Sequence, residues 1–167
     1  AIAAAMVAAV ALAYLALDLS RWKPVLPWAK LPGVLLSALV VAVNEEAAFR
    51  GGVLGLCRRS LSPRRALLAS SAVFAAVHFV DPSARGAVAD VTWRAGFEIL
   101  PRLFHRFAEP SMWLAGYSTL FALGWVLGAL TIRTRSLWCA LGFHAGLVFL
   151  KTAFQRFTLT DADALPW

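Results

Sequence analysis

Long apolar stretches, separated by short basic or proline-bearing connectors, account for most of this chain. A helix that spans a membrane needs about 20 consecutive apolar residues. Five stretches approach or reach that length, at residues 1–19, 33–57, 63–80, 111–132 and 136–154. Because the hydrocarbon core offers no water to backbone groups, only helices and closed barrels span it. The sequence therefore predicts an all-α fold, a polytopic transmembrane helix bundle with about five membrane helices.

The composition agrees with a membrane protein and excludes a polyanion-binding domain. Apolar residues make up 60% of the 167, only 15% are charged, and the mean hydropathy is +0.71. Soluble domains lie well outside this range. The net charge of +7 comes from short connectors without the basic, aromatic-interleaved patch that nucleic acid would require. We therefore predict an integral membrane protein with the lipid bilayer as its surroundings and no nucleic-acid partner.

The connectors also predict topology and domain organisation. Residues 58–65 and 133–135 carry arginines and no acids, so these connectors are predicted to face the cytoplasm. The predicted location is a bacterial inner (plasma) membrane. No linker suggests a second domain, and we expect one membrane-embedded domain over 1–167 with a motif-bearing core at about 33–154. The chain begins with Ala1 inside an apolar stretch, which indicates an N-terminal truncation.

One segment, residues 86–107, differs from the apolar stretches. Large apolar side chains alternate there with charged ones, and Pro101 is expected to kink any helix that forms. This amphipathic insertion is predicted to lie on the membrane surface or to cover the bundle rather than to span.

Ionisable residues interrupt three of the apolar stretches. Glu45, Glu46 and Arg50 lie in the second stretch, His78 in the third and His144 in the fifth. A charge at the centre of a membrane helix costs roughly 2.5–3.5 kcal/mol on insertion scales, so such residues usually form functional sites between helices. At 1.5 Å per residue, Glu45, His78 and His144 lie roughly 12–22 Å from the end of their helices. This shared depth predicts one site.

The spacing of the charged residues predicts different roles for the adjacent carboxylates of Glu45 and Glu46. Glu46 and Arg50 stand four residues apart in the orientation that favours an ion pair, whereas Glu45 lies about 100° further round the helix. Glu46 with Arg50 is therefore the predicted structural pair, and Glu45 the predicted chemical group. Glu45 with His78 is suited to activate a water as a general base, and His144 to polarise a carbonyl and stabilise the resulting oxyanion.

A metal centre is the competing interpretation of the same residues. One carboxylate and two histidines, here Glu45, His78 and His144, suit zinc with one open coordination position. No His-Glu-x-x-His pattern is present, and each ligand would come from a different helix. The cofactor prediction is therefore either none or zinc, and the residues alone leave both open.

These residues resemble a known family. Residues 45–50, Glu-Glu-Ala-Ala-Phe-Arg, are similar to the Glu-Glu-x-x-x-Arg motif of the CAAX protease and bacteriocin-processing (CPBP, or Abi) intramembrane proteases, which are related to the Ras-converting CAAX endopeptidases. Residues 74–78, Phe-Ala-Ala-Val-His, resemble its second motif, Phe-x-x-x-His. The resemblance covers roughly residues 35–149. Its motifs stand in order on consecutive predicted membrane helices.

The resemblance implies a helical membrane endopeptidase that cleaves a membrane-associated protein or peptide. In it, the residue matching Glu45 is the catalytic carboxylate, that matching His78 helps to activate water, and that matching His144 supports the oxyanion. The motifs supply the supporting residues Glu46, Arg50 and Phe74. The family has been described both as metalloproteases and as metal-independent glutamate proteases.

One position departs from the family pattern. The third motif is His-x-x-x-Asn or His-x-x-x-Asp, and Val148 occupies the polar position after His144. Loss of a single oxyanion donor lowers the rate by about 10²–10³-fold. A catalytically inactive immunity or scaffold protein is therefore the first alternative function. A proton-coupled transporter is the second, because midplane carboxylates and histidines also build proton relays.

Overall fold

The computed structural model describes residues 2–80, 93, 97, 100–101 and 103–160. These residues form two compact units, one of Ala1–Gly52 with Leu130–Trp167 and one of Val53–Ala129. We refer to them as unit 1 and unit 2. Most of the amphipathic segment 86–107 lies outside the described residues, so its predicted placement on the membrane surface stays a prediction.

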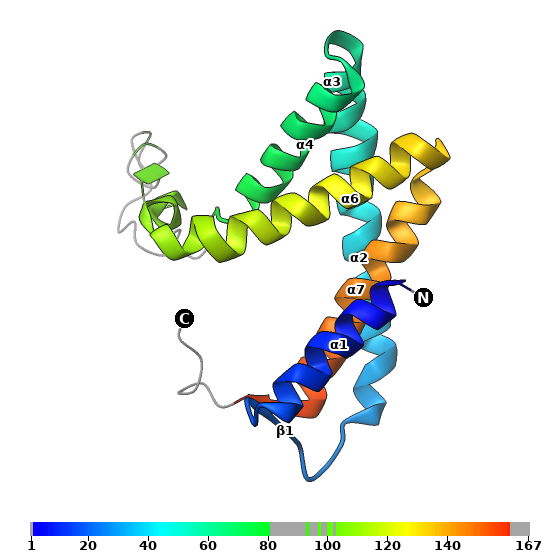
Figure 1. The fold of residues 1–167 in the computed structure, drawn as a ribbon, viewed down its shortest axis with the longest axis vertical. Helices are drawn as coiled ribbons and strands as arrows, with labels where there is room; N and C mark the ends of the chain where they lie inside the picture. Colours follow the sequence, from blue (N-terminus) through cyan, green and yellow to red (C-terminus); the bar gives the residue numbers. More distant parts are fainter. Residues whose placement is uncertain (1, 81–92, 94–96, 98–99, 102, 161–167) are drawn as a thin grey trace. The chain divides into compact units, whose positions relative to one another are not determined.

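Unit 1 is built on three helices, α1 (Ile2–Ala16), α2 (Leu31–Glu46) and α7 (Leu137–Phe157). Helix α7 packs against both α1 and α2 (Figure 1). A short antiparallel ribbon joins the end of α1 to the end of α7, because β1 (Ser20–Trp22) pairs with β2 (Thr158–Thr160). The 3₁₀ turn η1 (Trp28–Lys30) then leads into α2, and the Trp28 ring packs edge-on against Phe157 at 4.8 Å.

Helix α2 does not end at Glu46. It continues through a π-helical segment, η2 (Ala47–Val53), into α3 (Leu54–Ser60), and the whole helical stretch Trp28–Ser60 is 33 residues long. Gly51 and Gly52 lie in the π-helical segment, and in the sequence they predict either the close approach of a neighbouring helix or a local break. Single-turn π segments within α-helices occur frequently at functional sites.

Unit 2 contains α3 and α4 (Pro63–Val77), which pack together after a short connection. Pro63 stands at the first helical position after Ser62, as the sequence predicts, because its missing N–H is not needed there. The 3₁₀ turn η4 (His105–Ala108), the π segment η5 (Met112–Tyr117) and α6 (Ser118–Thr134) follow.

Small residues on α6 allow close packing against α4 within unit 2. A Cβ atom on Gly124 would lie 3.2 Å from the Cα of Ser71 and 3.0 Å from the Phe74 ring. The same addition at Gly128 would lie 2.5 Å from a methyl group of Leu67. This Gly-x-x-x-Gly pair thus allows two helices of unit 2 to pack closely.

The chain turns sharply between α6 and α7. Arg135 adopts a positive φ of 53°, and the Ser136 hydroxyl accepts a hydrogen bond from the Trp138 backbone N–H at 3.3 Å. This cap satisfies one of the N–H groups that every helix start leaves without an intrahelical partner.

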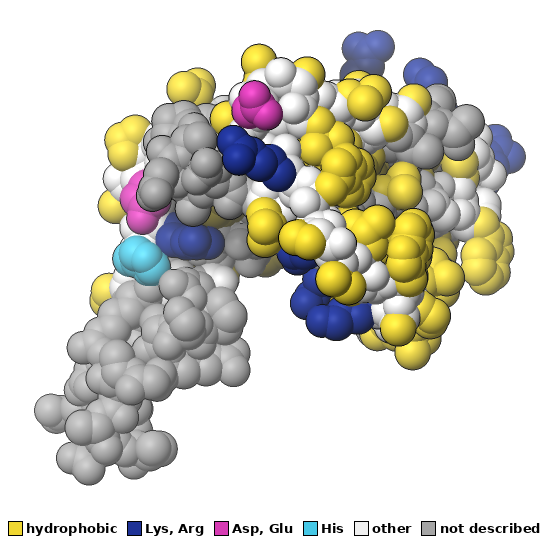
Figure 2. All heavy atoms as spheres, turned by 90° about the horizontal axis from the view of Figure 1, so that it is seen from below, with side chains coloured by type: hydrophobic (Ala, Val, Ile, Leu, Met, Phe, Trp, Pro, Cys, Tyr) yellow, Lys and Arg dark blue, Asp and Glu magenta, His cyan; other side chains and the backbone are white. Residues whose placement is uncertain are grey.

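Among the described residues, three helical stretches are long and apolar enough to cross a membrane, namely Trp28–Ser60, Met112–Thr134 and Leu137–Phe157. Helices α1 and α4 have 15 residues each, fewer than a full span needs. Large apolar side chains are exposed over the described surface, such as Leu36 (65%) and Trp138 (79%) (Figure 2). The all-α membrane helix bundle predicted from the sequence is confirmed.

Candidate functional site

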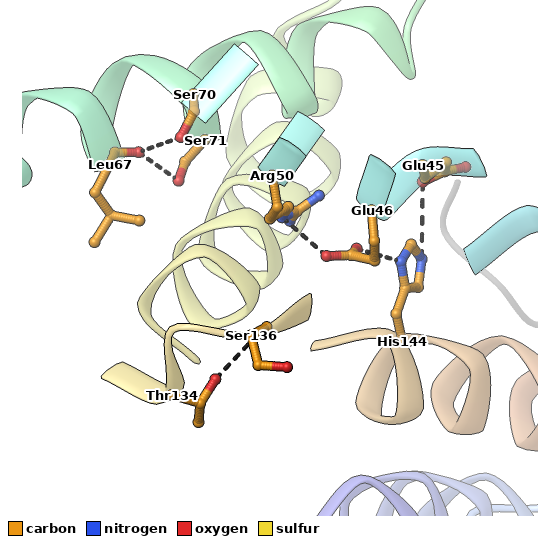
Figure 3. Close-up of polar contacts among 9 residues, drawn as sticks. All are labelled: Glu45, Glu46, Arg50, Leu67, Ser70, Ser71, Thr134, Ser136 and His144. Carbon is orange, nitrogen blue, oxygen red and sulfur yellow. Dashed lines mark hydrogen bonds and ion pairs between the residues drawn. The ribbon is translucent and has the colours of Figure 1, made fainter. Parts of the chain in front are cut away.

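In unit 1, α2 and α7 bring two carboxylates and one imidazole together. His144 on α7 is 4% exposed and lies between the Glu45 and Glu46 side chains of α2 (Figure 3). Its Nδ1 is 2.8 Å from Oε1 of Glu46, and its Nε2 is 3.8 Å from Oε2 of Glu45. Residues about 100 positions apart in the sequence therefore form one polar cluster inside the helix pair.

Glu46 also pairs with Arg50 on its own helix. The Nε of Arg50 is 3.2 Å from Oε2 of Glu46, and the two side chains are 3% and 0% exposed. The ion pair predicted from their spacing is present. The sequence did not reveal that the second oxygen of Glu46 is bonded to His144, since that contact depends on how α7 packs against α2.

The two adjacent carboxylates differ in access. The Glu45 side chain is 28% exposed, whereas the Glu46 side chain is completely buried. Successive residues on an α-helix point about 100° apart, so one carboxylate faces the packed interior and the other faces the outside of the cluster. Glu45 is therefore the carboxylate that a water or a substrate can reach.

The helix changes its geometry next to this cluster. The π segment begins at Ala47, directly after Glu46, and includes Arg50. Both Glu46 and Arg50 are buried. The π-helical turn thus lies within the long helix, beside the polar residues, and the buried ion pair joins its first half to the end of α2.

The second predicted motif lies in unit 2, with Phe74 on α4 and His78 directly after the end of α4. The Nδ1–H of His78 donates to the Phe74 carbonyl oxygen at 2.7 Å, and the two rings are 4.6 Å apart. Helix α4 ends at Val77, three residues before the predicted end, so His78 follows the last helical residue. That His78 acts together with Glu45 and His144 stays a prediction.

The valine that departs from the family pattern is half-buried on α7. Val148 carries no hydrogen-bond donor, and it stands one helical turn beyond His144. The only nearby side-chain amide on α2 belongs to Asn44, whose Nδ2 donates to the Val40 carbonyl oxygen at 2.8 Å. Asn44 is exposed and lies about 200° round the helix from Glu46, so it is not a replacement donor next to His144.

A zinc ion would need more ligands than unit 1 brings together. Catalytic zinc sites ordinarily use three protein ligands, and unit 1 supplies Glu45 and His144, with the Nδ1 of His144 already bonded to Glu46. Among the residues that the structure describes, no group of three or more His, Cys, Asp or Glu side chains is arranged to hold a metal. The donor set of unit 1 does not fit a zinc centre by itself, and zinc remains the competing prediction.

The cluster combines groups that are suited to proton transfer. An accessible carboxylate, a buried imidazole and a buried ion pair are groups that general base catalysis can use to orient and deprotonate a water.

Comparison with known proteins agrees with such a chemistry. The family model described as type II CAAX prenyl endopeptidase Rce1-like matches residues 27–150, a range that includes every residue of the cluster. No curated protein and no solved structure matches the chain.

Proposed function

This chain belongs to the Rce1-like type II CAAX prenyl endopeptidase family, and on that premise we propose that it is an intramembrane endopeptidase of the CAAX-processing type. It hydrolyses a peptide bond in a membrane-associated protein or peptide. The observation that carries the proposal is the cluster of Glu45, Glu46 and His144 between α2 and α7, together with the family match.

The proposed reaction begins with a water at Glu45. The carboxylate takes a proton from the water as its oxygen bonds to the scissile carbonyl carbon, and the carbonyl oxygen becomes an oxyanion. When this intermediate collapses, the C–N bond breaks and the proton passes to the departing nitrogen. A general base contributes typically 10²–10⁴-fold to such a step. His78 is proposed to share the water with Glu45, as the family motif implies.

The substrate is proposed to be tethered to the membrane, because the cluster belongs to helices that are long and apolar enough to span it. The family name points to a prenylated C-terminal tail, and a leader or sorting peptide is the alternative substrate within the same chemistry. The proposed location is a bacterial inner membrane, with the basic connectors facing the cytoplasm.

Cleavage of membrane-tethered peptides by the purified chain in lipid nanodiscs tests the proposal. The panel contains fluorogenic peptides with and without a prenylated C-terminal cysteine, and it is measured for the native chain and for Glu45→Gln. Cleavage that falls by about 10²-fold or more in Glu45→Gln supports a glutamate-dependent protease. Glu109→Gln, an exposed carboxylate outside the cluster, is the matched control and is expected to retain full cleavage.

A strong chelator added to the same assay separates the two mechanisms. Cleavage that persists supports water activation by Glu45, and cleavage that is lost and returns with zinc supports the metal mechanism. Equal cleavage by the native chain and Glu45→Gln would contradict both.

A catalytically inactive member of the family is the second candidate function, and Val148 is the observation that favours it. Absence of cleavage by the native chain together with cleavage by Val148→Asn would establish it, since the substitution restores the amide donor of the third motif.

A proton-coupled transporter is distinguished by a different measurement. Proton flux through the native chain in liposomes, lost in Glu45→Gln and unaccompanied by cleavage, would identify it.

A further inference from the structure

The connection between α3 and α4 in unit 2 gathers more arginines than any other stretch of eight residues. Within residues 58–65, four positions are arginine, namely Arg58, Arg59, Arg64 and Arg65. All four are exposed, and no residue from 47 to 80 is acidic. None of the four forms an ion pair with a residue that the structure describes. The described part of the chain therefore supplies no counter-charge to this surface.

We propose that residues 58–65, the basic connection, bind a phospholipid with an anionic headgroup. The helical stretch Trp28–Ser60, which is long and apolar enough to cross a membrane, ends within this connection. Clusters of four or more basic residues beside such a helix attract anionic lipids. The planar guanidinium also matches phosphate, because it can donate two parallel N–H bonds to one phosphate group. This lipid site is independent of the peptide cleavage proposed above.

Helix stability accounts for one pair of these arginines but not for the other. Arg58 and Arg59 lie in the last turn of α3, where the helix dipole favours positive charge. Arg64 and Arg65 directly follow Pro63 at the start of α4, where the dipole disfavours positive charge. A phosphate group beside Arg64 and Arg65 offsets this repulsion. The second pair is thus the one for which the lipid, rather than the helix, provides the favourable interaction.

Exposed leucines beside the arginines favour a lipid over a soluble anion. Leu56 on α3, Leu61 in the connection and Leu68 on α4 are all exposed. Acyl chains can cover these side chains while the arginines contact the headgroup. The exposed hydroxyl groups of Ser60 and Ser62 add further hydrogen-bond donors between the two arginine pairs. Free phosphate or an acidic peptide would satisfy the charge but leave the leucines without an apolar partner.

Native mass spectrometry of the full chain in dodecylmaltoside micelles tests the proposal. Dioleoylphosphatidylglycerol is the anionic probe, and dioleoylphosphatidylcholine is the reference with no net charge. The native chain is expected to retain the anionic lipid more tightly. Arg64→Gln combined with Arg65→Gln is expected to weaken that binding by about 30-fold. The matched control is Arg133→Gln combined with Arg135→Gln, which removes the same charge from exposed positions of another acid-free connector and is expected to change little.

Three outcomes would overturn the inference. Equal retention of the two lipids would show that the headgroup charge is not recognised, and equal losses in the two double variants would show attraction by net charge alone. Competition at equal concentration by soluble glycerophosphoglycerol or by an acidic peptide would show that the arginines do not require a lipid.

The midpoint of thermal unfolding gives a second readout, which does not depend on cleavage. Without added lipid, Arg64→Gln with Arg65→Gln is expected to unfold no earlier than the native chain, because the substitutions remove positive charge from the start of α4. Added dioleoylphosphatidylglycerol is expected to raise the midpoint of the native chain and of the control, since a ligand stabilises the state that binds it. An equal rise in Arg64→Gln with Arg65→Gln would contradict binding at the basic connection, whether or not the chain cleaves peptides.

Discussion

Two glycine pairs with the same spacing lie in different surroundings in the two units. On α6 in unit 2, Gly124 and Gly128 approach Ser71, Phe74 and Leu67 so closely that an added Cβ atom would lie within 3.0 Å of a neighbouring side chain. On α7 in unit 1, Gly142 and Gly146 flank His144, and a Cβ atom added to either would meet none of the described residues within 4 Å. The same Gly-x-x-x-Gly pattern therefore accompanies close helix packing in unit 2 and open space beside the helix in unit 1.

The difference indicates how each unit is held together. In unit 2, close contacts of small residues with apolar side chains, among them the fully buried Phe74 and Leu54, fix one helix against another. In unit 1, the contact between α2 and α7 includes the buried set of Arg50, Glu46 and His144. Unit 1 is thus expected to be sensitive to lost charge partners, and unit 2 to added volume.

Glu46→Ala is the largest expected perturbation. It leaves the Arg50 charge and the Nδ1–H of His144 buried without the carboxylate that contacts both, and breaking a buried ion pair typically costs about 3–5 kcal/mol. The free energy of unfolding in lipid micelles measures the effect. Glu46→Ala combined with Arg50→Met is expected to be more stable than Glu46→Ala alone, because it also removes the uncompensated charge. Additive losses in the double variant would contradict a charge-based contact in unit 1.

Gly124→Ala tests unit 2 by adding a single methyl group. The new Cβ would lie 3.2 Å from a backbone Cα atom of α4, which cannot move as a side chain can. Overpacking of this kind costs about 1–3 kcal/mol, more than the gain of up to about 1 kcal/mol in helix propensity. We therefore expect a lower midpoint of thermal unfolding. Gly128→Ala is expected to cost less, since the nearest atom is the end of the flexible Leu67 side chain. A higher midpoint for Gly124→Ala would show that α6 and α4 are not in close contact.

Much of this organisation follows from the sequence alone. Apolar length predicts the membrane helices, and Pro63 and Ser136 mark helix starts that the structure confirms. The ion pair of Glu46 with Arg50 follows from a spacing of four residues. These features depend on neighbours in the sequence, where helical geometry is fixed by 3.6 residues per turn.

Contacts between distant segments were not predictable in the same way. The bond between His144 and Glu46 requires α7 to lie beside α2 in one register, and shared depth indicates a cluster without saying which carboxylate binds the imidazole. The π segment after Glu46 was suggested by Gly51 and Gly52 only as a local break. The sequence also did not predict that α4 ends at Val77, because Phe79 and Val80 continue the apolar pattern past the last helical residue.

Gly142→Ala should have the smallest effect of the three, and one of opposite sign to Gly124→Ala. The added Cβ meets none of the described residues within 4 Å, so the substitution creates no steric clash. The free energy of unfolding rises by up to about 1 kcal/mol, because alanine restricts the unfolded chain more than glycine does. The midpoint of thermal unfolding is expected to rise slightly, with cleavage unchanged. A fall as large as that of Gly124→Ala would mean that this face of α7 is covered in the membrane, and that the two glycine pairs serve the same purpose after all.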